Sequence, residues 1–284
     1  MREIFAKGGK QMKIGIIGTG NMGNVLIDAF IESKAVPPEN ITITNRNINK
    51  AIVIKNKYNE INVKRSAKEV ITESDLIFLC VKPLDIHPLL QQVSNELSNS
   101  KCLISITSPV SVERLSTIVN CQVARIIPSI TNRALSGVTL ITFSESLSDH
   151  YREYLWSLCS KISTPVEIED NITRVASDIV SCGPAFFSYL LQRFIDAAVS
   201  ETEITKEQAT VLASQMMIGM GELLEKNIFT LPTLQEKVCV KGGVTGEGIK
   251  VLEAELGSMF HHLFQKTHDK YNEDISEVSE QFDN

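Results

Sequence analysis

The sequence has few aromatic residues and no excess of positive charge. Of its 284 residues, 6% are Phe, Trp or Tyr, which is unfavourable for the stacking surfaces that bind single-stranded nucleic acid. Lys and Arg number 28 against 34 Asp and Glu, for a formal charge of −6. A chain of this kind lacks the basic bias of nucleic-acid-binding domains. We therefore expect no nucleic-acid partner.

Other absences bear on membrane, compartment and metal. No run of 18 apolar residues occurs, so we expect no membrane span. The six cysteines form no C-x-x-C pair and lie mostly in apolar runs, which is typical of buried, reduced thiols in a cytoplasmic protein. The five histidines are scattered, and the pattern predicts no metal site.

Short apolar runs alternate with helical patterns over the first half of the chain. This alternation predicts an α/β fold with a Rossmann-type, doubly wound parallel sheet. The expected strands are 13–17, 41–44, 61–63, 75–81, 102–106 and 123–127.

After about Ile168 the strand signals stop and helical spacing takes over. Helices are expected over 178–198, from 205 onward and over 249–264. We predict a dinucleotide-binding domain over 13–168 and an all-helical dimerisation and substrate domain over 169–284. Residues 1–12 have no apolar core of a secretory signal and are expected to precede the fold as a leader.

A glycine-rich turn joins the first expected strand to the first expected helix. Here the pattern G-x-G-x-x-G is the fingerprint of a dinucleotide site. The first glycine allows the tight turn, the second lets the backbone approach a pyrophosphate, and the third lets the helix pack closely. An ordinary strand–helix turn is the alternative. The residues concerned are Gly18, Thr19, Gly20, Asn21, Met22 and Gly23.

The end of the second expected strand indicates which dinucleotide binds. An NAD site carries an acidic residue there, which accepts from the ribose 2′-hydroxyl. This chain reads Thr44-Asn45-Arg46-Asn47 instead, and the guanidinium of Arg46 suits a 2′-phosphate. The sequence therefore predicts NADPH as the cofactor, with a solvated loop arginine as the alternative.

The second half offers another anion-binding turn and a wide apolar helix face. Four glycines fall within 242–248, ahead of an expected helix, where backbone N–H groups can hold a carboxylate; Thr245 there can cap the helix or donate to the ligand, and a flexible loop is the alternative. A Met-rich face follows the capping box at Thr205. Its breadth favours burial against a second subunit, and so a homodimer through the C-terminal helices, or a higher oligomer.

Together these motifs resemble the pyrroline-5-carboxylate reductase family. The matching segments occur in the same order as in the family and span most of the chain. They are residues 17–23, Asn45-Arg46, Val81-Lys82-Pro83, Gly183-Pro184-Ala185-Phe186 and Gly242-Gly243-Val244-Thr245.

The resemblance implies reduction of 1-pyrroline-5-carboxylate to proline by NADPH, by hydride transfer to the imine carbon. Val81, Lys82 and Pro83 would lie near the nicotinamide ribose. The cyclic imino acid would bind at Gly242, Gly243, Val244 and Thr245, either of the same chain or of a partner subunit. Thr245 would orient it for reaction, and Ser129 would also contact it. A protonated imine is already electrophilic, so positioning of the substrate can suffice.

Several residues depart from the family pattern near the expected substrate. Ser129 and Ile130 stand where the family usually has Asn and Thr, and Val240, Lys241 and Val244 replace other residues of its second glycine-rich segment. The departures favour an alternative, a divergent family member that binds NADP(H) in a regulatory or competence-related role with little reductase activity. A β-hydroxyacid dehydrogenase is a weaker alternative, because residues 183–189 lack its catalytic lysine.

Overall fold

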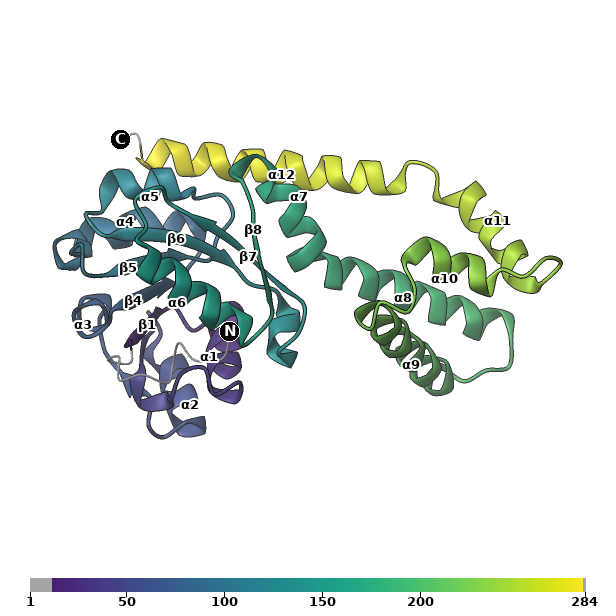
Figure 1. Cartoon of the computed structure of the whole chain (residues 1–284), viewed down its shortest axis with the longest axis horizontal. Coiled ribbons are helices and arrows are strands. Elements are labelled where there is room, and N and C mark those ends of the chain that lie inside the picture. The colour runs from purple at the N-terminus through teal and green to yellow at the C-terminus, as the bar shows by residue number, and fades with distance from the viewer. Residues whose placement is uncertain (1–11, 283–284) are drawn as a thin grey trace. The chain divides into compact units, whose positions relative to one another are not determined.

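The computed structural model describes residues 12–282 and separates into two compact units. The first unit extends to Cys182 and takes up the chain again from Thr267, whereas the second comprises Gly183–Lys266. The first unit contains the whole β-sheet, and the second is built from helices (Figure 1). The predicted α/β class and the all-helical second part are confirmed.

The first unit is organised around an eight-stranded sheet of order β3-β2-β1-β4-β5-β6-β7-β8. The order reverses beside β1, because β2 pairs with one of its edges and β4 with the other, with Ile14 opposite both Ile41 and Leu76. The strands are β1 Ile14–Ile17, β2 Ile41–Thr44, β3 Asn62–Val63, β4 Leu76–Leu79, β5 Cys102–Ser105, β6 Gln122–Ile127, β7 Val138–Phe143 and β8 Thr164–Glu167.

Helices cover both faces of this sheet. The α-helices of the first unit are α1 Asn21–Glu32, α2 Ile48–Lys57, α3 Ala67–Glu73, α4 Pro83–Val93, α5 Val112–Ile118, α6 Asp149–Ser160 and α7 Thr173–Ser177. Short 3-10 helices are η1 Pro38–Asn40, η2 Ser94–Glu96, η3 Ile130–Ala134 and η4 Asp170–Ile172, and a π-helix, η5, runs over Asp178–Cys182.

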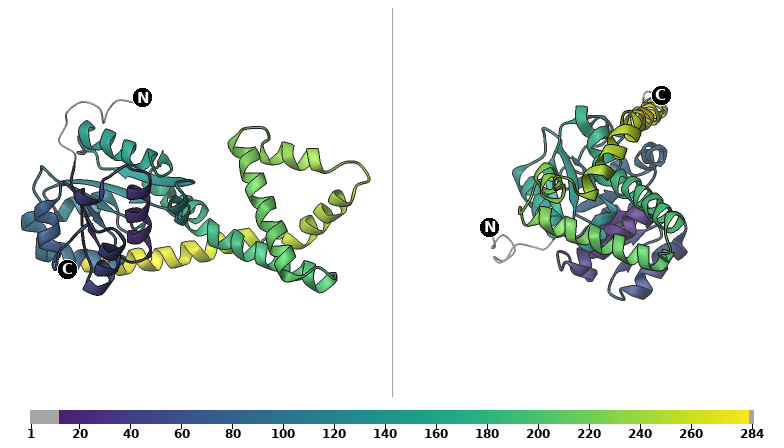
Figure 2. Two further views of the ribbon diagram at one scale, coloured as in Figure 1. Left: turned by 90° about the horizontal axis from the view of Figure 1, so that it is seen from below. Right: turned by 90° about the vertical axis from the view of Figure 1, so that its right-hand side faces the viewer.

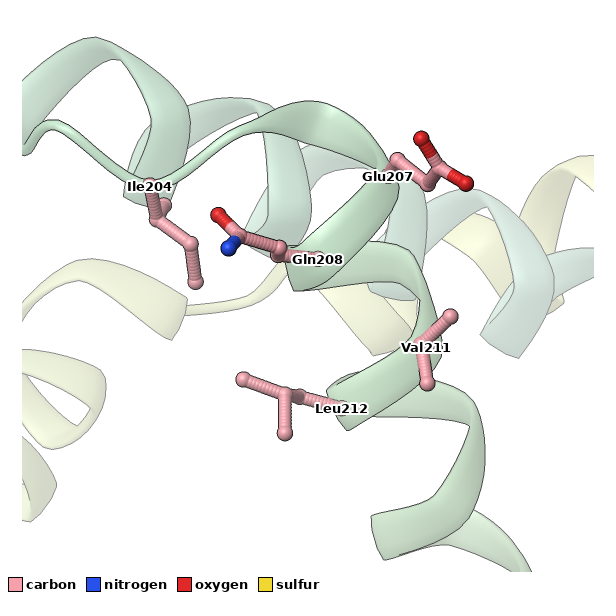
Figure 3. A pocket seen from close by; sticks show the side chains of 5 residues that line it. All are labelled: Ile204, Glu207, Gln208, Val211 and Leu212. Carbon is pink, nitrogen blue, oxygen red and sulfur yellow. The ribbon is translucent and has the colours of Figure 1, made fainter.

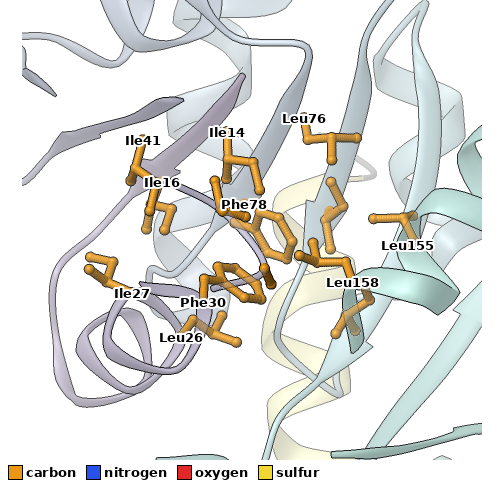
Figure 4. Packing of buried hydrophobic residues seen from close by; sticks show 14 of the residues in the cluster. Ile14, Ile16, Leu26, Ile27, Phe30, Ile41, Leu76, Phe78, Leu155 and Leu158 are labelled. Atoms are coloured by element: carbon orange, nitrogen blue, oxygen red, sulfur yellow. The ribbon is translucent and has the colours of Figure 1, made fainter. Parts of the chain in front are cut away.

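Two apolar clusters form the core, one on each face of the sheet. On one face, α1, α2 and α6 pack against the strands, with Phe30 edge-on to Phe78 at 5.6 Å between ring centroids (Figure 4). On the other face, α3, α4 and α5 do the same, and Val278 from the C-terminal part of α12 (Met259–Phe282) is fully buried among them. The C-terminal part of α12 is thus part of the first unit.

Two strands occur that the sequence analysis did not predict. β7 pairs antiparallel with β6, since residues 128–137 are too short a connection for a parallel crossover. β8 is an edge strand that contains Pro165, a residue that weakens any strand signal in a sequence.

The second unit consists of α8 Gly183–Glu201, α9 Lys206–Glu225, α10 Leu231–Val238, α11 Val244–Leu256 and the first part of α12, joined by turns (Figure 2). The capping box predicted at Thr205 is present, with Gln208 as its partner. The helix expected over 249–264 starts earlier, at Val244, and is interrupted at Gly257, whose φ of 47° ends α11.

The boundary between the units also differs from the expected one at residue 168. Helix α7 and the π-helix belong to the first unit because Thr173, Ser177 and Asp178 are buried there. Met12, expected in the leader, is buried in the core as well. The remainder of the expected leader, residues 1–11, lies outside the described residues. No helix among residues 12–282 is both long and apolar enough to cross a membrane.

Candidate functional site

The glycine-rich turn lies between β1 and α1, at the point where the strand order reverses. Gly18 has a φ of 101°, and a Cβ on it would stand 2.3 Å from the carbonyl oxygen of Cys80. A Cβ on Gly23 would stand 2.2 Å from the carbonyl oxygen of Gly18. Gly18 therefore requires glycine for both its positive φ and its packing, and Gly23 requires glycine for its packing.

Gly20 differs from its two neighbours because the space beside it is open. A Cβ there would meet no atom within 4 Å. Gly20 is also the N-cap of α1, and no side chain caps this helix, so the first N–H groups of α1 are left for a ligand. An open approach to an uncapped helix N-terminus at the strand-order reversal fits the diphosphate of a dinucleotide.

The carboxyl end of β2 lies beside this turn. The backbone N–H of Gly18 donates to Thr44 O at 2.9 Å, and that of Thr19 donates to Asn45 Oδ1 at 3.1 Å. Asn45 thus holds the turn in place. The hydroxyl of Thr19 is buried and has no partner within the described structure, which leaves a polar group at the floor of the turn.

Arg46 projects from the same strand end into solvent. Its side chain is 93% exposed, and its contact with Asp85 is a long ion pair of 3.9 Å between Nη1 and Oδ1. An exposed pair of this kind contributes little to stability. The guanidinium is therefore available for a 2′-phosphate, the role that the sequence predicts for it.

Val81, Lys82 and Pro83 follow β4, the strand on the other side of β1. Lys82 is the N-cap of α4 without a side-chain hydrogen bond, and Pro83 occupies the first turn. Lys82 and Pro83 line a cleft of about 340 Å³ together with Leu84, Asp85, Asp274 and Glu277. Desolvation raises the pKa of the neighbouring Cys80 thiol to about 12, so this thiol stays protonated and is no nucleophile.

Ser129 lies at the end of β6 and is fully buried. Its hydroxyl donates to Val180 O at 2.8 Å and accepts from Thr131 N at 3.3 Å. These bonds hold η3 against the π-helix. The described structure therefore gives the Ser129 hydroxyl a structural partner, and direct contact with a substrate stays a prediction.

The second glycine-rich turn belongs to the second unit. Gly242 has a φ of 76°, and Gly243 is the N-cap of α11 without a side-chain cap. Val244 and Thr245 form the first helical turn, so Thr245 is not the cap that the sequence allowed it to be. Val244 is 88% exposed. The turn presents backbone N–H groups at a helix N-terminus, an arrangement suited to a carboxylate.

The second unit also carries a large apolar surface. Ile204, Glu207, Gln208, Val211 and Leu212 line a cavity of about 520 Å³ at the start of α9 (Figure 3). The core within this unit is small: Ile195, Ala209 and Ala213 are its buried hydrophobic residues. Within residues 12–282, no group of three His, Cys, Asp or Glu side chains is placed to hold a metal ion.

Two buried ionic groups of the first unit are absent from the residues predicted from the sequence. Arg125 on β6 is 1% exposed and donates to Thr173 Oγ1 at 2.7 Å, besides pairing with Asp170. Asp178 is also buried and pairs with Arg174 at 2.8 Å. Desolvation raises the pKa of Asp170 despite the nearby Arg125. No motif marks Arg125, because its partners Asp170 and Thr173 are remote in the sequence. Arg174 and Asp178 have the i,i+4 spacing of a helical ion pair, which is a local signal for that pair.

Two family profiles match the chain. Residues 13–109 match the family described as NADP oxidoreductase coenzyme F420-dependent. Residues 170–274 match that described as pyrroline-5-carboxylate reductase dimerisation. The first match contains strands β1 to β5 of the sheet, and the second contains the helices of the second unit.

Similar proteins match this chain over nearly its whole length. The chain is 61% identical to ComE operon protein 4 of Bacillus subtilis over 95% of its own length and 99% of that protein. It is 28% identical to pyrroline-5-carboxylate reductase 3 of the same organism, with the same coverage. Its fold resembles the crystal structure of Plasmodium falciparum pyrroline carboxylate reductase with NADP bound, with a TM-score of 0.81, 21% identity and coverage of 95% and 100% of the two chains.

Proposed function

We propose that this chain, which belongs to the pyrroline-5-carboxylate reductase family, reduces a cyclic imino acid with NADPH, and that 1-pyrroline-5-carboxylate is the substrate and proline the product. The observation that carries the proposal is the open approach to Gly20 at the uncapped start of α1. Residues 18–23 would hold the diphosphate, Asn45 and Arg46 the phosphorylated ribose, and Val81, Lys82 and Pro83 the nicotinamide ribose.

NADPH, when bound, supplies a hydride. In the proposed reaction a protonated imine gains that hydride at carbon, the C=N π bond breaks, and the nitrogen keeps its proton as a secondary amine. The chain then has to bind and orient the imine rather than donate a proton. The N–H groups of residues 242–245 would hold the substrate carboxylate, and the Thr245 hydroxyl would lie near the substrate nitrogen.

We further propose that the protein works in the cytoplasm as a homodimer through its helical unit. The six cysteines are free thiols, which suits a reducing compartment. The small core of the helical unit and its match to a dimerisation family support a second copy as the cover for its apolar surface.

A second candidate function has its own support. The 61% identity to ComE operon protein 4 favours a competence-related or regulatory role in which NADP(H) is bound and little imine is reduced. The departures at Ser129, Ile130 and Val244 point the same way, because they change side chains expected around the substrate but none of the residues proposed to hold the cofactor.

The experiment that separates the two measures NADPH oxidation with 1-pyrroline-5-carboxylate between pH 6 and 9, and NADPH binding by fluorescence. Turnover above background together with rescue of a proline auxotroph supports the reductase. Tight NADPH binding without turnover supports the second candidate. Absence of NADPH binding contradicts both.

Thr245 provides an internal check on the substrate assignment. We expect Thr245→Val to lower kcat/KM for the imine by about 10-fold, the equivalent of one lost hydrogen bond, and to leave the Kd for NADPH unchanged. Thr245→Ser keeps the hydroxyl and should stay near wild type. Thr210→Val, on the exposed side of α9, serves as the control. Equal kcat/KM for wild type and Thr245→Val would remove Thr245 from the reaction.

A further inference from the structure

The chain passes between its two units twice, after Cys182 and before Thr267. One buried carboxylate lies close to both of these connections. Asp178 is in the π-helix that precedes the first connection, and it is 1% exposed. Its Oδ2 accepts a hydrogen bond of 2.7 Å from the hydroxyl of Thr267, the first residue after the second connection.

The charge of Asp178 is balanced by Arg174, one turn earlier. The distance from Arg174 Nη2 to Asp178 Oδ1 is 2.8 Å. A buried carboxylate is costly unless it is paired and hydrogen-bonded. Arg174 supplies the ion pair, and the Thr267 hydroxyl supplies a hydrogen bond to the other carboxylate oxygen.

The C-terminal part of α12 is held at a second point near the same arginine. The guanidinium of Arg174 lies over the ring of Tyr271, 5.5 Å from its centroid. The Tyr271 hydroxyl donates to Ser108 O at 3.1 Å. The start of this helical stretch is therefore fixed both to the π-helix and to the loop after β5.

The π-helix is itself fixed to the carboxyl edge of the sheet. Ser181 Oγ donates to Pro128 O at 3.0 Å, and Ser129 Oγ donates to Val180 O at 2.8 Å. Pro128 and Ser129 directly follow β6, whereas Val180 and Ser181 lie inside the π-helix. π-helical turns are rare and occur often at functional positions. Here the π-helix joins the carboxyl edge of the sheet, where the nucleotide site is proposed, to both connections.

We propose that Asp178 is a positioning residue for the reduction. By holding Thr267, it ties both connections to one point of the first unit, and residues 242–245 lie on the stretch of chain between these connections. The inference rests on the proposed function, since it assigns the reacting imine to that turn. Asp178 acts through Thr267, and contact with cofactor or substrate is not part of its role.

The test compares Asp178→Asn and Thr267→Val with wild type in the full-length protein. Asp178→Asn removes the charge opposite Arg174, and Thr267→Val removes the hydroxyl at nearly constant volume. We expect kcat for imine reduction to fall by about 10- to 100-fold, the effect of misplacing reacting groups by about 1 Å. The Kd for NADPH should stay within about 2-fold, because its proposed residues lie outside this group of contacts.

Hydrogen exchange gives a readout that does not depend on turnover. Amides of residues 183–190 and 259–266 should exchange faster in both variants, whereas the amides of β1 and β4 keep wild-type rates. Thr267→Ser restores the hydroxyl and should restore both kcat and exchange. Thr72→Val is the control, because the Thr72 hydroxyl bonds only within its own helix, to Lys68 O.

Two results would overturn the inference. The first is wild-type exchange at both connections in Thr267→Val and Asp178→Asn. The second is a uniform loss of protection that includes β1 and β4, which would make Asp178 a general stability residue. If wild-type protein reduces no imine, the proposed function fails, and the exchange data still decide whether Asp178 fixes the connections.

Discussion

Gly20 and Gly23 lie three residues apart in one turn, yet an added side chain meets different surroundings at each. The Cβ of Ala at position 20 would have open space, and at position 23 it would press into Gly18 O at 2.2 Å. Gly20 also has a φ of −76°, which alanine adopts without strain. Packing therefore requires glycine at position 23, whereas at position 20 it leaves open the space proposed for the ligand.

We expect Gly20→Ala to keep the thermal stability of wild type and to weaken NADPH binding at least 10-fold, because the methyl group occupies the space of the diphosphate. Gly23→Ala should instead lower the melting temperature. Thermal unfolding and fluorescence titration of the two variants give the comparison. A Gly20→Ala protein that binds NADPH as wild type does would place the diphosphate elsewhere.

Arg46 decides the proposed choice between NADPH and NADH. Arg46→Gln should raise the Kd for NADPH by roughly 10- to 150-fold, because hydrogen bonds to a charged group contribute about 1.5–3 kcal/mol, and should leave the Kd for NADH nearly unchanged. Arg65→Gln, also exposed on the first unit, is the matched control. Equal losses for the two nucleotides would show that Arg46 does not read the 2′-phosphate.

Among the elements, helix α3 begins with a capping box formed by Ser66 and Glu69. Ser66 accepts from the backbone N–H of Glu69, and the Glu69 carboxylate accepts from the backbone N–H and the hydroxyl of Ser66. These hydrogen bonds lower the pKa of Glu69. Their stabilising contribution is therefore complete above the ordinary glutamate pKa of about 4.3 and is lost as the pH falls through the lowered value.

Ser66→Ala should reduce the free energy of unfolding by about 1 kcal/mol near neutral pH. The difference from wild type should shrink as the solution is acidified through the pKa of Glu69. Urea denaturation at several pH values measures both effects. Ser98→Ala is the control, because the Ser98 hydroxyl bonds to the exposed hydroxyl of Ser100. A pH-independent difference would show that Glu69 does not take part in the cap.

Strands that form short buried runs can be predicted from the sequence. A strand that depends on pairing with an adjacent strand cannot. The runs that form β1, β2, β4, β5 and β6 are short, rich in isoleucine, leucine or valine, and almost wholly buried. β7 has the sequence Val-Thr-Leu-Ile-Thr-Phe, which is rich in strand-forming residues, although it is not among the strands predicted above. β8 is largely exposed and contains a proline, so its strand conformation depends on pairing with β7.

At the level of the whole molecule, the helical unit exposes large apolar side chains on α8 and α9. Val211 and Leu212 on α9 are 57% and 62% exposed, and Phe194 on α8 is 65% exposed. Apolar surface of this extent is typical of an interface. The proposed second copy would bury it, and the gain from each buried leucine side chain is about 1.5–3 kcal/mol.

Leu212→Glu should therefore shift the protein from dimer to monomer at micromolar concentration, because a charge is placed in an apolar contact. Light scattering coupled to size-exclusion chromatography measures the mass. Val53→Glu, at a 67% exposed position of α2 in the first unit, should leave the mass unchanged. A dimer that survives Leu212→Glu would place the interface away from α9.

Three features can be recognised in the sequence without a structure: the fold class, the dinucleotide fingerprint at residues 18–23 and the lack of an acidic residue after the second strand. These features are local, because backbone conformation, helix capping and strand burial leave patterns in neighbouring residues. The candidate cofactor residues could therefore be named from the sequence, although their contacts with a cofactor stay predictions.

The division into units and the burial of charges depend on packing between remote parts of the chain. Thr267 belongs to the first unit, and its hydroxyl donates to Asp178, a residue 89 positions earlier in the chain. Ser129 and Arg125 likewise find their partners across the sheet edge. Contacts between remote residues depend on how the elements pack, and no local pattern in the sequence records them.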